Sequence, residues 1–195
     1  MKEEVILRAY AYAVNEDLES ISLVMISNDL NISRRKIYRL FKDKHELMFD
    51  VYKIIVDELL LEAHTLNKKN KKTNGYKEVL QAMENMIKTF LNNPKKIKYI
   101  TKFDALKIDD KEILKKKNDF YRKCDFTQGA LYKGVADGSI HNVVNPYRMS
   151  CVILEVIIGL VSRYLDTEKE EFIDYMDEKD IYEIIKVYAC YLENK

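Results

Sequence analysis

The stretch from Ser33 to His45 combines residue types that can bind an anion. Its positive side chains, set against the single acid Asp43 for a local net charge of +5, are Arg34, Arg35, Lys36, Arg39, Lys42 and Lys44. Ser33 is a favourable N-cap, because its hydroxyl can accept from the free backbone N–H groups of the next turn. Ile37, Leu40 and Phe41 are three and four residues apart and form one apolar stripe. The segment is therefore predicted to be a short helix with one apolar and one basic face.

Three cations at the start of a helix oppose the positive end of its dipole, at a cost of roughly 0.3–1 kcal/mol each. A polyanion bound at that end would turn the cost into binding free energy, because lysine and arginine displace counterions from phosphates. On charge alone, an ordinary solvated basic face explains the pattern equally well.

The flanking sequence favours the first interpretation. Ser22 is placed to cap a preceding short helix, and Asn31 tolerates the left-handed conformation that a tight turn between two helices needs. Lys44 opens a long helix, where a cation again suits a phosphate. Helix, short turn and basic helix is the arrangement that places a recognition helix in the major groove of DNA.

The stretch Ile6–Leu47 resembles the N-terminal domain of the tetracycline-repressor (TetR) family of bacterial transcription regulators. The segments that carry the resemblance are Ile26-Ser27, Ile32-Ser33, Ile37 to Phe41 and Asp43 to Leu47. It implies that Tyr38 and Lys44 contact phosphates, and that operator sequence is read from the basic positions of the second motif helix. The predicted DNA-binding residues are Ser22, Ser33, Arg34, Arg35, Lys36, Tyr38, Arg39 and Lys44. Asp17 and Asn31 replace glycines of the family pattern, and Ala13 replaces a core phenylalanine.

Composition favours an all-α fold for the whole chain. Its 195 residues include five glycines, two prolines and no tryptophan. A β-rich fold needs many tight turns, and this chain has few of the residues that favour them. The net charge of +1 creates no global field toward nucleic acid, so any binding must come from a local basic surface. We expect a three-helix DNA-binding head at residues 1–50 and a helical ligand-binding and dimerisation domain at residues 51–195.

Apolar spacing predicts the helices that follow the head. A long helix at 44–66 carries two adjacent apolar rows and is expected to connect the two domains. After a polar loop at 67–75, helical spacing resumes at 76–91 and 97–106, and then in one helix at 111–136 that Gly129 could kink. Two further helices are expected at Pro146–Leu165 and Lys179–Glu193.

The central helices carry large side chains that could line a small-molecule pocket, and the family resemblance implies an inducer there. The candidate ligand-binding residues are Met83, Met86, Phe90, Tyr99, Phe103, Phe120 and Tyr121. Taken singly, each of these residues is more typical of an ordinary core than of a ligand pocket.

The helix at 146–165 is apolar on more sides than one buried face requires, which favours burial against a second subunit. With the last helix it could form a four-helix bundle in a two-fold symmetric dimer. The predicted dimer interface is Ile153, Ile157, Gly159, Leu160, Tyr164, Ile184 and Tyr188. Burial within one subunit is the alternative.

Residues for other chemistry do not cluster in the sequence. Three separate histidines and three separate cysteines predict neither a metal site nor a disulfide framework, and no cofactor is expected. The longest apolar run, Cys151–Val161, is too short to span a membrane. The sequence thus predicts a cytoplasmic, homodimeric transcription regulator that is released from its double-stranded DNA operator by a small-molecule inducer. The alternatives are a regulator of this fold that acts through a protein partner, and a small helical enzyme.

Overall fold

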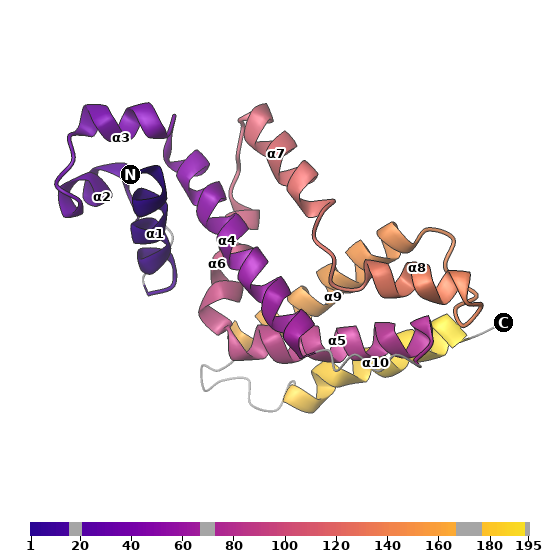
Figure 1. Ribbon diagram of the computed structural model, residues 1–195. Coiled ribbons are helices and arrows are strands. Elements are labelled where there is room, and N and C mark those ends of the chain that lie inside the picture. Colours follow the sequence, from indigo (N-terminus) through magenta and orange to yellow (C-terminus); the bar gives the residue numbers. More distant parts are fainter. Residues whose placement is uncertain (16–20, 67–72, 167–176, 194–195) are drawn as a thin grey trace. The chain divides into compact units, whose positions relative to one another are not determined.

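The structure is a computed structural model that describes residues 1–15, 21–66, 73–166 and 177–193 (Figure 1). Throughout these ranges the regular structure is helical, without a strand, which confirms the predicted all-α class. The helices are α1 (Lys2–Ala13), α2 (Leu23–Asp29), α3 (Arg34–Leu40), α4 (Lys44–Thr65), α5 (Gly75–Asn92), α6 (Pro94–Ala105), α7 (Lys111–Tyr121), α8 (Gln128–Ala136), α9 (Pro146–Asp166) and α10 (Glu178–Glu193).

The chain forms two compact units. The first unit contains residues 1–58 and 95–124, and the second contains residues 59–94 and 125–195. Helix α4 therefore contributes its first part to one unit and its end to the other. These units divide the chain by its internal contacts. The predicted domains, residues 1–50 for DNA binding and residues 51–195 for ligand binding and dimerisation, divide it by function, and this division stays a prediction.

The three helices α1–α3 form the head of the first unit, as local signals in the sequence predict. Ser22 caps α2 by accepting from the Met25 N–H at 3.1 Å, and Ser33 caps α3 by accepting from the Lys36 N–H at 3.3 Å. Between the two helices Asn31 has a φ of 49°, the left-handed conformation expected of this turn. Asp17 lies outside the described residues.

The apolar stripes of the head meet in a small core. Its fully buried members, all 1 % exposed or less, include Val5, Ala9, Ile26, Ile37 and Phe41. Ala13 is buried in the same head, so the alanine at this position is part of the core. Burial of Ile37 and Phe41 fixes α3 by one side only and leaves its other side to solvent.

The prediction of one helix at 111–136 is wrong: the structure has two helices, α7 and α8, joined by residues 122–127. The Asp125 carboxylate accepts from the Gly129 N–H at 3.1 Å and so satisfies a backbone donor in the first turn of α8. Phe126 turns inward against Phe90, with ring centroids 5.6 Å apart in an edge-to-face arrangement. A local cap and a buried ring thus end one helix and start the next.

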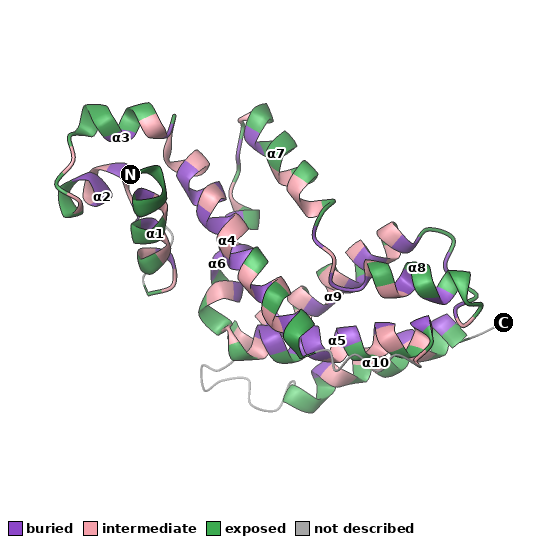
Figure 2. Cartoon of the chain, viewed as in Figure 1, coloured by how far each residue is buried: buried purple, intermediate pink, exposed green. Residues whose placement is uncertain are grey.

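Helix α5 is the centre of the second unit and packs against α8, α9 and α10. Its inner side is buried along the whole helix (Figure 2). It begins at Gly75, where a Cβ would lie only 2.0 Å from the Gly134 nitrogen of α8. After α8, Asp137 and Ser139 accept from the Gly75 and Tyr76 N–H groups at 2.8 and 3.0 Å. The turn after α8 therefore caps α5.

Candidate nucleic-acid interface

Helix α3 presents its basic residues to solvent. The side chains of Arg34, Arg35, Lys36 and Arg39 are all exposed, whereas Ile37 between them is fully buried (Figure 2). Within the described part of the chain, none of these four cations forms an ion pair. The structure therefore places the predicted base-reading residues on one open surface, which we call the α3 basic face.

Other lysines of the same unit are paired with acids. Lys2 lies 3.3 Å and Lys53 2.6 Å from the Asp50 carboxylate, and Lys117 lies 2.5 Å from Asp104. The α3 basic face differs from these pairs because, among the residues that the structure describes, none of its cations is paired with an acid. Arg34, Arg35 and Lys36 stand in the first turn, at the positive end of the helix dipole, and Arg39 stands in the last turn.

The remaining predicted DNA-binding residues flank this face. Tyr38 is 51 % exposed, a large solvent area for an aromatic ring that could instead have packed inward. Ser22 and Lys44 are half-buried at the starts of α2 and α4. Ser33 is exposed, and its hydroxyl proton stays available while its oxygen caps α3.

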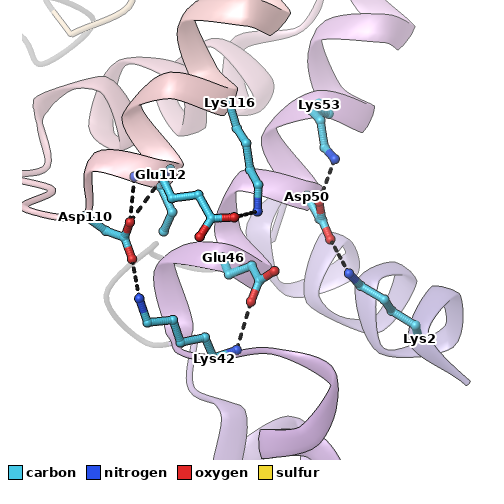
Figure 3. A network of polar contacts seen from close by, with 9 residues as sticks. Lys2, Lys42, Glu46, Asp50, Lys53, Asp110, Glu112 and Lys116 are labelled. Carbon is cyan, nitrogen blue, oxygen red and sulfur yellow. Dashed lines mark hydrogen bonds and ion pairs between the residues drawn. The ribbon is translucent and has the colours of Figure 1, made fainter.

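Acidic side chains cap the start of α4 (Figure 3). Asp43 accepts from the Glu46 N–H at 2.9 Å, and Glu46 in turn accepts from the Lys42 N–H at 2.8 Å. This reciprocal capping satisfies two free backbone donors and stabilises the beginning of the helix. The position of Lys44 is fixed by this cap.

A contact that the sequence did not predict ties the head to α7 (Figure 3). The Lys42 ammonium donates to the Asp110 carboxylate at 2.7 Å, and Asp110 also caps α7 by accepting from the Glu112 N–H at 2.8 Å. The hydrogen bond from Lys42 lowers the pKa of Asp110, with the two backbone N–H groups of α7 as further causes. In sequence both residues look like solvated charges, because nothing in their local spacing shows that they meet.

The seven candidate ligand-binding residues fall into the two units. Tyr99, Phe103, Phe120 and Tyr121 belong to the first unit, where the last three have ring contacts with Phe49 or Tyr52 of α4 and Tyr99 stacks on Phe103. We call these six rings the aromatic cluster. Burial raises the pKa of Tyr99, whose hydroxyl donates to the Met48 carbonyl at 2.8 Å.

The other candidates, Met83, Met86 and Phe90, lie in the core of the second unit, each no more than 1 % exposed. The structure thus brings four of the seven together in one cluster and assigns the remaining three to the core around α5. A separate pocket of about 260 Å³ in the second unit is lined by ends of α5, α9 and α10 and includes Lys88, Tyr164 and Tyr182.

The predicted dimer residues divide by burial. Ile153 and Ile157 are fully buried and Tyr188 is 9 % exposed within a single subunit. Leu160, Tyr164 and Ile184 are half-buried, and Gly159 is exposed, with open space where its Cβ would be. The apolar residues that are more than 40 % exposed on α9 and α10 are Val152, Val187 and Tyr191, which periodicity alone did not single out.

Among the residues that the structure places, no three histidine, cysteine or acidic side chains come together as a metal site would require. None of the described helices is both long and apolar enough to cross a bilayer.

Several solved structures with the same fold are described as transcriptional regulators. A TetR-family regulatory protein from Rhodococcus RHA1 superposes with a TM-score of 0.61 at 11 % identity, covering 100 % of this chain and 97 % of that one. The regulator FadR from Bacillus subtilis, solved in complex with stearoyl-CoA, gives 0.66 at 14 % identity, with 100 % and 98 % covered. A TetR transcriptional regulator from Rhodococcus sp. RHA1 gives 0.63 at 12 % identity, with 97 % and 93 % covered.

No family model and no curated relative matches the chain. The structural likenesses extend over nearly the full length of both partners, so they include the head as well as the helices that follow it. The chain therefore has the fold of TetR-family transcriptional regulators, and the resemblance seen in the head sequence is confirmed at the level of fold.

Proposed function

We propose that the protein is a sequence-specific DNA-binding transcriptional regulator of the TetR type. The observation that carries the proposal is the α3 basic face: four exposed cations on a capped helix, none of which forms an ion pair with a residue that the structure describes. A helix held by a buried stripe on one side and basic on the other can enter the major groove while its phosphate contacts set its position.

The test is a selection of bound sequences from random duplexes, followed by titrations at several salt concentrations. The wild-type protein should select one operator, and its affinity should fall steeply with salt. Arg35→Ala or Lys36→Ala should also change the preferred sequence, whereas Lys44→Ala should weaken binding to all sequences alike. Equal losses on every sequence for all three variants would reject the assignment of base readers.

We propose further that the protein acts as a homodimer through the outer faces of α9 and α10. The face combines Val152, Val156, Gly159 and Leu160 of α9 with Ile184, Val187 and Tyr191 of α10. These positions recur every three to four residues on each helix, and the open space at Gly159 would let a partner helix approach closely. This surface replaces the buried Ile153 and Ile157 of the sequence-based proposal.

The dimer is tested by light scattering after size-exclusion chromatography. Val187→Asp should give monomers, because a charge at this exposed position would be buried without a partner in the dimer. Val135→Asp on α8, at a residue 43 % exposed and outside the proposed surface, is the matched control and should stay dimeric. Identical masses for both variants would argue against this face.

Repression that a small-molecule inducer relieves is the mode of action that we favour. FadR, a neighbour at 14 % identity, was solved with stearoyl-CoA, which supports a ligand site in this fold. In our mechanism the inducer changes the orientation of α4, which belongs to both units, and so shifts the population away from the spacing that fits the operator. A regulator that acts through a protein partner would keep the fold but show no operator selection.

A further inference from the structure

One ammonium group of the first unit lies among three aromatic rings. The Lys117 nitrogen is 5.5 Å from the ring centroid of Phe103, 5.9 Å from that of Tyr121 and 6.0 Å from that of Tyr52. The rings come from three different helices, α6, α7 and α4. All three distances are within the range in which an aromatic face attracts a cation.

A carboxylate completes this arrangement. Asp104 of α6 holds the Lys117 ammonium with Oδ1 at 2.5 Å and accepts from the Tyr121 hydroxyl with Oδ2 at 2.9 Å. The Tyr121 hydroxyl also accepts from the hydroxyl of Tyr52, whose ring is 1 % exposed. Burial, followed by the proximity of Tyr121 and Asp104, raises the pKa of Tyr52, so its hydroxyl stays protonated and can donate. The hydroxyl chain orients two of the rings and leaves Oδ1 for a cation.

A lysine is a poor match for these walls. Its ammonium is compact and strongly hydrated, so it gives up more hydration among aromatic rings than an alkylated cation does. An ion pair with Asp104 alone would need the carboxylate but not three converging rings, nor a tyrosine hydroxyl in the core. The flexible four-carbon stem of Lys117, whose side chain is 17 % exposed, lets the ammonium move to water when another cation arrives.

We propose that the rings of Tyr52, Phe103 and Tyr121 and the Asp104 carboxylate form a binding site for a monovalent organic cation, which displaces the Lys117 ammonium. The ligand class is a quaternary or alkylated ammonium compound with a weakly hydrated head group. The rings supply cation–π contacts, and Asp104 supplies the opposite charge.

Displacement of Lys117 would change the position of α7 and thereby affect the head. The same helix holds Asp104 near its C-terminal end through Lys117 and holds Lys42 of the head at its N-terminal cap, Asp110. Release of the Lys117 contact removes one link between α7 and α6 and leaves the Tyr121–Asp104 hydrogen bond as a pivot, so α7 can shift and weaken the placement of Asp110 against Lys42. This regulatory consequence rests on the proposed DNA-binding function, whereas occupancy of the site by a cation does not.

The experiment is a calorimetric titration of the full-length protein without DNA. The probes are choline and its uncharged isostere 3,3-dimethylbutan-1-ol, which have the same shape and differ in charge. Lys117→Ala should bind choline about tenfold more tightly than the wild type, because the internal competitor is gone. Lys116→Ala, which removes the neighbouring lysine of α7 that pairs with Glu112, is the matched control and should bind like the wild type.

Adding Asp104→Asn to Lys117→Ala should weaken choline binding by about tenfold, since the carboxylate is lost. Lys117→Gln is titrated in parallel and decides the question if Lys117→Ala lacks the helical circular dichroism of the wild type. Choline affinities that are equal in the wild type and the folded Lys117 variants would overturn the site, as would equal binding of the uncharged isostere. Because no DNA is present, failure of operator binding leaves this outcome unaffected.

Discussion

Removal of the three cations at the start of α3 should stabilise the fold while it abolishes operator binding. The variant is the triple substitution Arg34→Ala, Arg35→Ala and Lys36→Ala. All three side chains are exposed and, among the described residues, form no ion pair, so truncation breaks no internal ion pair. A stretch that served only the fold would instead carry acids at the start of the helix.

The size of the effect follows from the helix dipole. Each cation in the first turn costs roughly 0.3–1 kcal/mol, so the three together cost about 1–3 kcal/mol at low ionic strength. Alanine is also at least as good a helix former as arginine or lysine. For a chain of this length, about 1 kcal/mol corresponds to a rise of about 2–4 °C in Tm. The slope of binding affinity against salt should flatten by about 0.9 for every phosphate contact that is lost.

Urea unfolding at fixed protein concentration and salt-dependent operator titrations measure the two effects. Lys116→Ala is the control, because this exposed lysine of α7 pairs with Glu112 at 2.9 Å and lies outside the α3 basic face. It should not raise the free energy of unfolding and should leave the salt slope unchanged. A triple variant that loses stability by more than about 1 kcal/mol, or that binds the operator normally, would refute our account of why these cations are there.

Four further outcomes are expected. Asp110→Asn should release the Lys42 ammonium for phosphate and steepen the salt dependence of DNA binding by up to about 0.9 per subunit; an unchanged slope would show that Lys42 does not reach DNA. Burial raises the pKa of the Cys124 thiol from 9.0 to about 12, so a thiol reagent at pH 7 should label the exposed Cys190 at once and Cys124 only on unfolding. Since the folded state holds that proton more tightly, the stabilisation from Cys124 is complete below pH 9 and is lost between pH 9 and 12, which urea unfolding across this range would detect. Gly75→Ala should lower the free energy of unfolding by about 1–3 kcal/mol or more, because a Cβ would lie 2.0 Å from the Gly134 backbone; a neutral effect would contradict the close approach of α5 and α8.

The head was predictable because its signals are local. Ser22 and Ser33 are caps within a few residues of the donors that they satisfy, and Asn31 needs only its own side chain to tolerate a positive φ. The apolar spacing of Ile37 and Phe41 then fixes which side of α3 faces inward. Once the apolar side of α3 faces inward, its basic residues are exposed on the other side.

The break between α7 and α8 was not predictable from the same kinds of signal. Phe120, Cys124 and Leu131 continue an acceptable helical pattern, and the glycine at which the sequence suggests a kink, Gly129, lies inside α8 and not at the break. What ends α7 is the insertion of Phe126 against Phe90, a residue of another helix. Apolar spacing predicts that a side chain is buried, but it does not predict which element the side chain packs against.

The same limit applies to the proposed dimer face. Ile153 and Ile157 have the apolar spacing of an interface, but the core of their own subunit already covers them. Val152 and Val187 each precede a buried residue, lie about 100° around the helix from it and remain half exposed or more. Only the packing of α5 against α9 and α10 separates the two sets, and that packing is a tertiary property.

Helix α7 links two contacts that each look like a solvated ion pair in the sequence. A ligand can shift an equilibrium only by the difference between its affinities for the two states, and a bound cation gains that difference where Lys117 leaves the rings. The exposed pair of Lys42 and Asp110 is too well solvated to silence DNA binding alone, so it can only tune the head. In the mechanism that we propose, release of the operator therefore also requires a change in the distance between the two heads of a dimer, and α4, which belongs to both units, is the element that we propose carries that change.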